Sequence, residues 1–126
     1  MNITGTYELD GVQITFRTSM LEEALYRTWL VKFKDVATDD PTMSHFDLWL
    51  YMAACTVSVE GINWTRPARN ADEETMVASY VSFMGQINRR FFDGLFEAMY
   101  EHNAPLSSDV DKTDDKLTDA EKKTTT

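Results

Sequence analysis

Residues 71–105, ADEETMVASYVSFMGQINRRFFDGLFEAMYEHNAP, decide the fold. They carry one long helical pattern that stops at Asn103-Ala104-Pro105. At about 1.5 Å per residue, some 30 helical residues would be roughly 45 Å long, more than a compact domain of this size needs. We therefore expect either a break at Gly85 or Gly94, or a far end that projects toward another chain. The main apolar stripe of this segment consists of Met76 or Val77, Tyr80, Met84, Ile87, Phe91, Leu95 and Ala98.

The chain has more aromatic and methionine side chains than this stripe can hold. Phe91 belongs to the stripe and is predicted to lie in the core, whereas other rings of the segment lie beside it. A well-filled core is one explanation, but exposed methionine-rich apolar surface is typical of adaptable protein binding, and we favour that interpretation. The residues predicted to bind a partner are Trp49, Met52, Phe92, Phe96 and Met99.

The first seventeen residues predict a β-hairpin. Val12, Ile14 and Phe16 alternate with polar residues, and Asp10-Gly11 is a pair that tolerates positive φ in a two-residue turn. Because an isolated hairpin is only marginally stable in water, its apolar side should lie on the helices or on another subunit.

Two further helices are expected between the hairpin and residue 71. Ser19 with Glu22 forms a capping-box pattern, and that helix should end near Val36. A second helix should begin at Ser44 or His45 and run to about residue 59, with apolar residues on nearly all sides. A third should begin at Ala71 or Asp72, as described above.

These elements predict a mainly α fold, an N-terminal β-hairpin followed by a three-helix core, or α+β if the hairpin is counted. Residues 1–105 form one domain in this prediction. Residues 106–126 are acidic and lysine-containing, with too few apolar side chains to offset the entropy of ordering, so they are predicted to be a disordered tail.

Composition excludes several classes of function. The net charge of -9, from 21 acidic and 12 basic residues, disfavours nucleic acid and anionic membranes as partners. The N-terminus lacks the pattern of a signal peptide, and no apolar run approaches the roughly 18 residues of a membrane span. With its single cysteine, Cys55, the chain is expected to be a soluble intracellular protein.

Candidate residues for chemistry are few. His45 and His102 belong to no metal-binding motif and are expected at helix ends, while Cys55 lies in an apolar run that favours an inert thiol. No motif for a nucleophile, a phosphate loop or a cofactor is present, so we expect no catalytic, cofactor-binding or metal site. The arginines expected to form local ion pairs, rather than a phosphate-binding patch, are Arg66, Arg69, Arg89 and Arg90.

The order of these segments resembles that of the tail assembly chaperones of long-tailed bacteriophages. The likeness covers roughly residues 12–105: a short β segment with VQITFR, a helix with a tryptophan, the aromatic helix HFDLWLYMAAC, and a last helix closing with FFDGLFEAMYEHNAP. The resemblance implies a non-catalytic factor in the host cell cytoplasm that binds and solubilises the tape measure protein and helps recruit tail tube subunits. A homo-oligomer is compatible with it.

Two other functions remain open at this point. A structural virion protein, such as a head–tail or tail completion component, would use the same hairpin and helices for stable ring assembly. An acidic inhibitor that mimics DNA would need rows of acids on folded surface, whereas six of the acids lie in residues 109–126 among four lysines.

Overall fold

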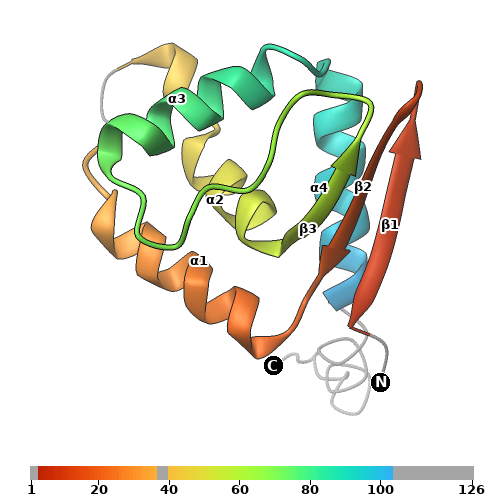
Figure 1. Ribbon diagram of the computed structural model, residues 1–126, viewed down its shortest axis with the longest axis horizontal. Coiled ribbons are helices and arrows are strands. Elements are labelled where there is room, and N and C mark those ends of the chain that lie inside the picture. The colour runs from red at the N-terminus through yellow and green to blue at the C-terminus, as the bar shows by residue number, and fades with distance from the viewer. Residues whose placement is uncertain (1–2, 37–39, 104–126) are drawn as a thin grey trace, which may run out of the picture.

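The computed structural model describes residues 3–36 and 40–103, an α+β fold with four α-helices and one three-stranded antiparallel sheet (Figure 1). The predicted tail of residues 106–126 lies outside the described residues. In chain order the elements are β1 (Thr4–Leu9), β2 (Val12–Arg17), α1 (Met20–Lys32), the 3-10 helix η1 (Pro41–Met43), α2 (Phe46–Cys55), β3 (Thr56–Glu60), α3 (Glu73–Met84) and α4 (Arg89–Asn103).

The N-terminal hairpin is confirmed. β1 pairs antiparallel with β2, and the register places Leu9 opposite Val12. Asp10 and Gly11 lie between the two strands and have φ of 54° and 83°. A two-residue hairpin turn of type I′ requires positive φ at both positions.

The prediction of a second helix that runs to residue 59 is wrong. The helix α2 ends at Cys55, and the next five residues form β3, which pairs with the free edge of β2. The β-branched side chains of Thr56, Val57 and Val59 favour a strand, and the Thr56 hydroxyl donates a hydrogen bond of 2.7 Å to the Met52 carbonyl at the end of α2.

The long third helix is in fact two helices, so the predicted three-helix core is corrected to four helices. Of the two glycines considered as interruptions, Gly85 marks the break and Gly94 lies inside α4. α4 starts again at Arg89 because the Asn88 side chain accepts a hydrogen bond of 2.8 Å from the Phe91 amide, which caps the new helix. The break removes the projecting end that one long helix would have had.

The helix starts follow local sequence, with one exception. Ser19 caps α1 in a capping box with Glu22, as predicted, and Asp72 caps α3. α1 ends at Lys32 rather than near residue 36, and α2 begins after His45 without a side-chain cap. Before it, Pro41–Met43 forms the short η1 turn.

The core lies between the sheet and the helices. α2 occupies the centre, with α1 and α3 on either side of it and α4 packed along the sheet (Figure 1). Seven of the ten α2 residues are buried. α4 approaches β1 closely at Gly94, where any β-carbon would overlap the Tyr7 side chain.

Candidate protein-interaction surfaces

The structure buries most of the residues predicted to bind a partner. Trp49, Met52, Phe92 and Met99 are between 0% and 3% exposed, and Phe96 is half-buried against the core. The prediction that Phe92 and Met99 face a client or another subunit is therefore wrong for the free chain. Their side chains leave almost no surface that another protein could contact.

The added strand and the break at Gly85 explain this burial. Because α4 folds back along the sheet, Phe91 meets the edge of Tyr7 at 5.2 Å and Phe92 meets the edge of His45 at 5.3 Å, centroid to centroid. Phe91 was predicted to lie in the core, and its exposure of 3% confirms this prediction. Four helices and a sheet create more interior than three helices would, and the surplus rings fill it.

Part of α4 does reach the surface near its C-terminal end. The Tyr100 ring is 62% exposed and stacks on the Phe96 ring, with centroids 6.1 Å apart and planes at 24°. These two rings form a small apolar spot flanked by the exposed acids Glu97 and Glu101.

The more extensive exposed apolar surface lies on α1. Its exposed positions recur at helical spacing on the side opposite the buried Trp29 and Phe33. Three of the side chains are large and apolar, with exposures of 79% for Met20, 73% for Leu21 and 72% for Val31. We call this surface the α1 stripe; it consists of Met20, Leu21, Ala24, Thr28 and Val31.

A hollow runs beside the α1 stripe, between the first half of α1 and the segment that joins β3 to α3. Its volume is about 320 Å³, and we call it the α1 groove. Leu21 and Ala24 belong to both the stripe and the groove, so the two form one continuous surface. The groove is lined by Leu21, Glu22, Ala24, Leu25, Arg66 and Arg69.

Hydrogen bonds fix the far wall of the groove to the helices. The Trp29 indole donates to the Arg69 carbonyl at 3.0 Å, and the Lys32 ammonium donates to the Ala71 carbonyl at 2.9 Å. Arg66 in turn donates to the Ala54 carbonyl at 3.0 Å, at the end of α2. The groove therefore has its shape before any partner arrives.

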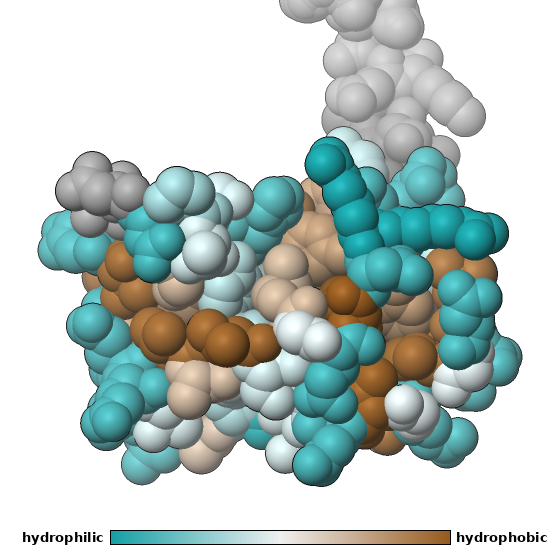
Figure 2. All heavy atoms as spheres, turned by 90° about the horizontal axis from the view of Figure 1, so that it is seen from above, coloured by the Kyte–Doolittle hydropathy of each residue, from teal (hydrophilic) through white to brown (hydrophobic). Residues whose placement is uncertain are grey.

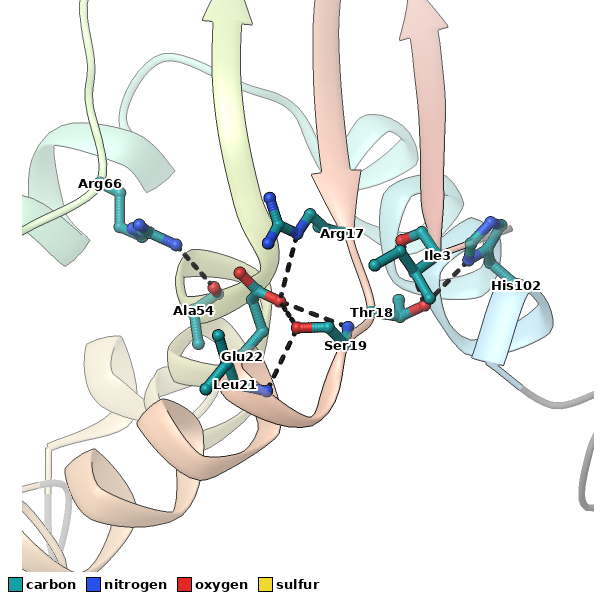
Figure 3. Close-up of polar contacts among 9 residues, drawn as sticks. All are labelled: Ile3, Arg17, Thr18, Ser19, Leu21, Glu22, Ala54, Arg66 and His102. Atoms are coloured by element: carbon teal, nitrogen blue, oxygen red, sulfur yellow. Dashed lines mark hydrogen bonds and ion pairs between the residues drawn. The ribbon is translucent and has the colours of Figure 1, made fainter. Parts of the chain in front are cut away.

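Glu22 is the buried acid of the groove, at 8% exposure. In Figure 3 dashed lines join its carboxylate to Ser19 and Arg17, and none joins it to Arg66. One of its carboxylate oxygens accepts hydrogen bonds from the Ser19 hydroxyl and amide and lies 3.8 Å from Arg17 Nε. Arg17 lies beside this carboxylate, so three arginines, Arg17, Arg66 and Arg69, surround one acid and the net charge here is positive.

The surroundings of α1 are basic although the chain as a whole is acidic. Six of the eight Lys and Arg residues in the described part of the chain lie at the end of β2, on α1 and the turn after it, or in the groove wall. Arg27 is partly neutralised by Glu23 on the same helix, at 3.0 Å. The six are Arg17, Arg27, Lys32, Lys34, Arg66 and Arg69.

The expected local pairing of four arginines holds for one of them. Arg89 lies 3.4 Å from Asp93, one turn along α4. Arg66 bonds to a backbone carbonyl instead, and the backbone of Arg69 accepts a bond from Trp29. Arg66 and Arg69 thus line the α1 groove without an acid partner among the described residues, whereas Arg89 is paired with an acid on its own helix.

A second, smaller hollow lies where α3 turns into α4. It has a volume of about 200 Å³ and includes the edge of Phe92. Figure 2 looks onto this end of the molecule, where hydrophobic patches are interrupted by hydrophilic side chains. Its lining consists of His45, Met84, Ile87, Asn88, Arg89 and Phe92.

The cysteine and the two histidines, the side chains considered for chemistry, have structural positions in the fold. Burial raises the pKa of the Cys55 thiol to about 12, which removes it as a nucleophile near neutral pH. His102 lies 3.0 Å from the Thr18 hydroxyl and packs edge-on against Phe16, while His45 precedes α2. In residues 3–36 and 40–103, no group of three His, Cys, Asp or Glu side chains is placed to hold a metal ion.

Comparisons with known proteins add no relative. The chain matches no protein family, no curated protein and no solved structure. None of the helices in the described part of the chain is long and apolar enough to cross a membrane.

Proposed function

We propose that this chain is a non-catalytic assembly chaperone for the tails of long-tailed bacteriophages, acting in the host cytoplasm. Its client is the tape measure protein, and its second task is to help recruit tail tube subunits. The family assignment rests on the resemblance of residues 12–105 described above. The mode of action rests on the surface of α1.

The observation that carries the proposal is the α1 stripe. Met20, Leu21 and Val31 are each more than 70% exposed on one face of a single helix, in a protein that buries its aromatic residues efficiently. Apolar surface left in water is favourable to cover, at about 25 cal/mol per Å². A stripe of this kind suits the binding of an amphipathic helix, as in other helix-in-groove complexes.

A tape measure client needs such cover before the tail is built. Long helical proteins expose apolar faces until their assembly partners arrive, and those faces promote aggregation. A small partner with a preformed groove can cover them reversibly and leave when tube subunits add. The function requires a weak, exchangeable contact, for which a stripe on one helix is sufficient.

The test is co-expression with the tape measure protein, which the proposal expects to be the product of a very long open frame near this gene. The soluble fraction of the client should rise with the wild-type chain and fall back with Val31→Asp, because a carboxylate in the stripe opposes burial. Val81→Asp is the matched control: Val81 is also an exposed valine, at 58%, but lies on α3.

Two outcomes would contradict the proposal. If both aspartate variants keep the client soluble, α1 is not the contact surface. If the chain is found in purified phage particles at fixed stoichiometry, it is a structural virion protein and not a chaperone.

A further inference from the structure

We infer that the α1 stripe and α1 groove together bind an acidic amphipathic helix, whose carboxylates lie against Arg66 and Arg69. This inference rests on the proposed function for the identity of the partner as a client. The chemistry of the partner follows from the stripe, the groove and the charges beside them.

The shape favours a helix. The stripe offers contacts at Leu21, Thr28 and Val31, in steps of seven and three residues, a spacing that keeps them on one face where a second helix can interdigitate. The groove continues this surface sideways from Leu21 toward the joining segment. A helix laid along α1 would place its apolar side on the stripe and one flank over the groove.

The charges favour acids on the flanks of that helix. Arg66 and Arg69 line the groove on one side of the stripe, and Lys32 lies on the same side, one turn from Thr28. Arg27 lies on the other side of the stripe. A helix with glutamates beside its apolar positions would meet positive charge mainly on the groove flank, since Glu23 partly neutralises Arg27 on the other flank, whereas lysines over the groove would be repelled.

Among the described residues, Glu22 is the only acid that lines the groove, and it does not reverse this preference. One oxygen of Glu22 is held by Ser19 and Arg17, and its side chain is nine-tenths buried. With Arg17 beside Glu22, the two groove arginines leave the groove with a net positive charge. This local charge stands against the net charge of -9 of the whole chain, so the attraction of an acidic partner is confined to this face.

A helix fits this surface better than nucleic acid does. Phosphate chains need basic groups that follow the backbone, but here the basic side chains are separated by the apolar α1 stripe. Exposed Met20, Leu21 and Val31 would gain nothing from phosphate. The mixture of an apolar centre and charged flanks is that of a helix–helix contact.

The experiment uses the full chain and two synthetic helical peptides. Both peptides have the same apolar residues at helical spacing; one has glutamate on both flanks and the other has lysine. Binding is measured by fluorescence anisotropy at low and at high salt. We expect the glutamate peptide to bind at least roughly ten times more tightly than the lysine peptide at low salt, with the difference shrinking as salt screens the charges.

Variants locate the charge effect. R66Q with R69Q should weaken the glutamate peptide roughly 3- to 30-fold, because two partly exposed ion pairs are lost. R89Q with R90Q removes the same charge from the start of α4 and should leave the affinity unchanged within about twofold. Because Arg66 also bonds to Ala54, R69Q alone is measured as well, and circular dichroism checks that each variant is folded.

Several outcomes would overturn the inference. Equal binding of the two peptides, or of neither, would do so, as would tighter binding of a single-stranded oligonucleotide than of the glutamate peptide. A dimer of this chain that V31D breaks and V81D preserves would show that a second copy covers the stripe instead.

The failure of the inference and that of the proposed function are separable. If both peptides bind equally and V31D weakens the binding of both, the groove binds apolar helices regardless of their charge. The chaperone proposal then stands. If the glutamate peptide binds but the tape measure protein is not solubilised, the groove has a different acidic partner, and the chaperone proposal fails.

Discussion

α4 buries most of its large apolar residues, whereas α1 leaves several of them exposed to solvent. α4 contains most of the side chains that were predicted to bind a partner, yet two of them, Phe92 and Met99, are at most 3% exposed. α1 contains fewer aromatic residues, yet Leu21 and Val31 are more than 70% exposed. The difference teaches that residue type alone does not identify a binding surface; what matters is which face of a helix the rest of the chain covers.

The cause lies in the neighbours of each helix. α4 lies along the sheet on one side and near α2 on another, so a broad apolar face is needed to fill the space. α1 packs mainly against α2, where Tyr26 contacts Tyr51 and, just past the end of the helix, Phe33 contacts Phe46. Apolar residues on the other side of α1 have no partner within the described part of the chain.

The largest effect on stability is expected when Phe92→Ala is compared with Val31→Ala. Removal of the buried ring should lower the free energy of unfolding by about 3–5 kcal/mol, because the lost contacts leave a cavity. The same truncation at the exposed Val31 should change it by less than about 0.5 kcal/mol. Urea unfolding followed by circular dichroism measures both.

Similar costs at the two positions would break the comparison. They would mean that the α1 stripe is covered in the free protein, or that the Phe92 ring is not part of the packed core.

A smaller effect is expected from pH, through the buried thiol beneath α1. Cys55 ends α2 and is close enough to feel the charges of the groove residues Glu22 and Arg66. Burial raises its pKa from 9.0 to about 12, so between these values the folded chain keeps a proton that the unfolded chain loses. The free energy of unfolding should therefore fall as pH rises above 9, by at most about 1.4 kcal/mol per pH unit from this group.

The control is Cys55→Ala, which should reduce the slope of the profile between about pH 9 and pH 10; the slope that remains comes from Tyr26, Tyr51 and Tyr80, whose pKa values burial also raises. Unfolding is measured at each pH by denaturant titration. A wild-type profile as flat as that of the variant would mean that water reaches the thiol through the groove, and that the base of α1 is less tightly packed than α4.

Local features were predictable from the sequence, and long-range ones were not. The turn at Asp10-Gly11 and the cap at Ser19 depend on neighbouring residues, and both are confirmed. β3 was missed because residues 56–60 become a strand only when paired with β2, about forty residues earlier. The start of α4 could have been found from Asn88, a residue favoured at helix N-termini.

The candidate surface was harder to predict for the same reason. Met20, Leu21 and Val31 look like ordinary helix residues, and the choice between core and surface depends on where α2 and the groove wall lie. The aromatic excess drew the interpretation toward α4, because large rings carry the most apolar area. Burial of those rings needed a sheet edge and a fourth helix that sequence periodicity did not show.

The most direct test of the account is site-specific photo-crosslinking in the co-expressed complex with the tape measure protein. A photoreactive amino acid replaces Val31 in one sample and Val81 in another, two exposed valines on different helices. We expect crosslinks to a helical segment of the client from position 31 and none from position 81. Crosslinks from position 81 alone would place the contact on α3 and contradict the role of α1.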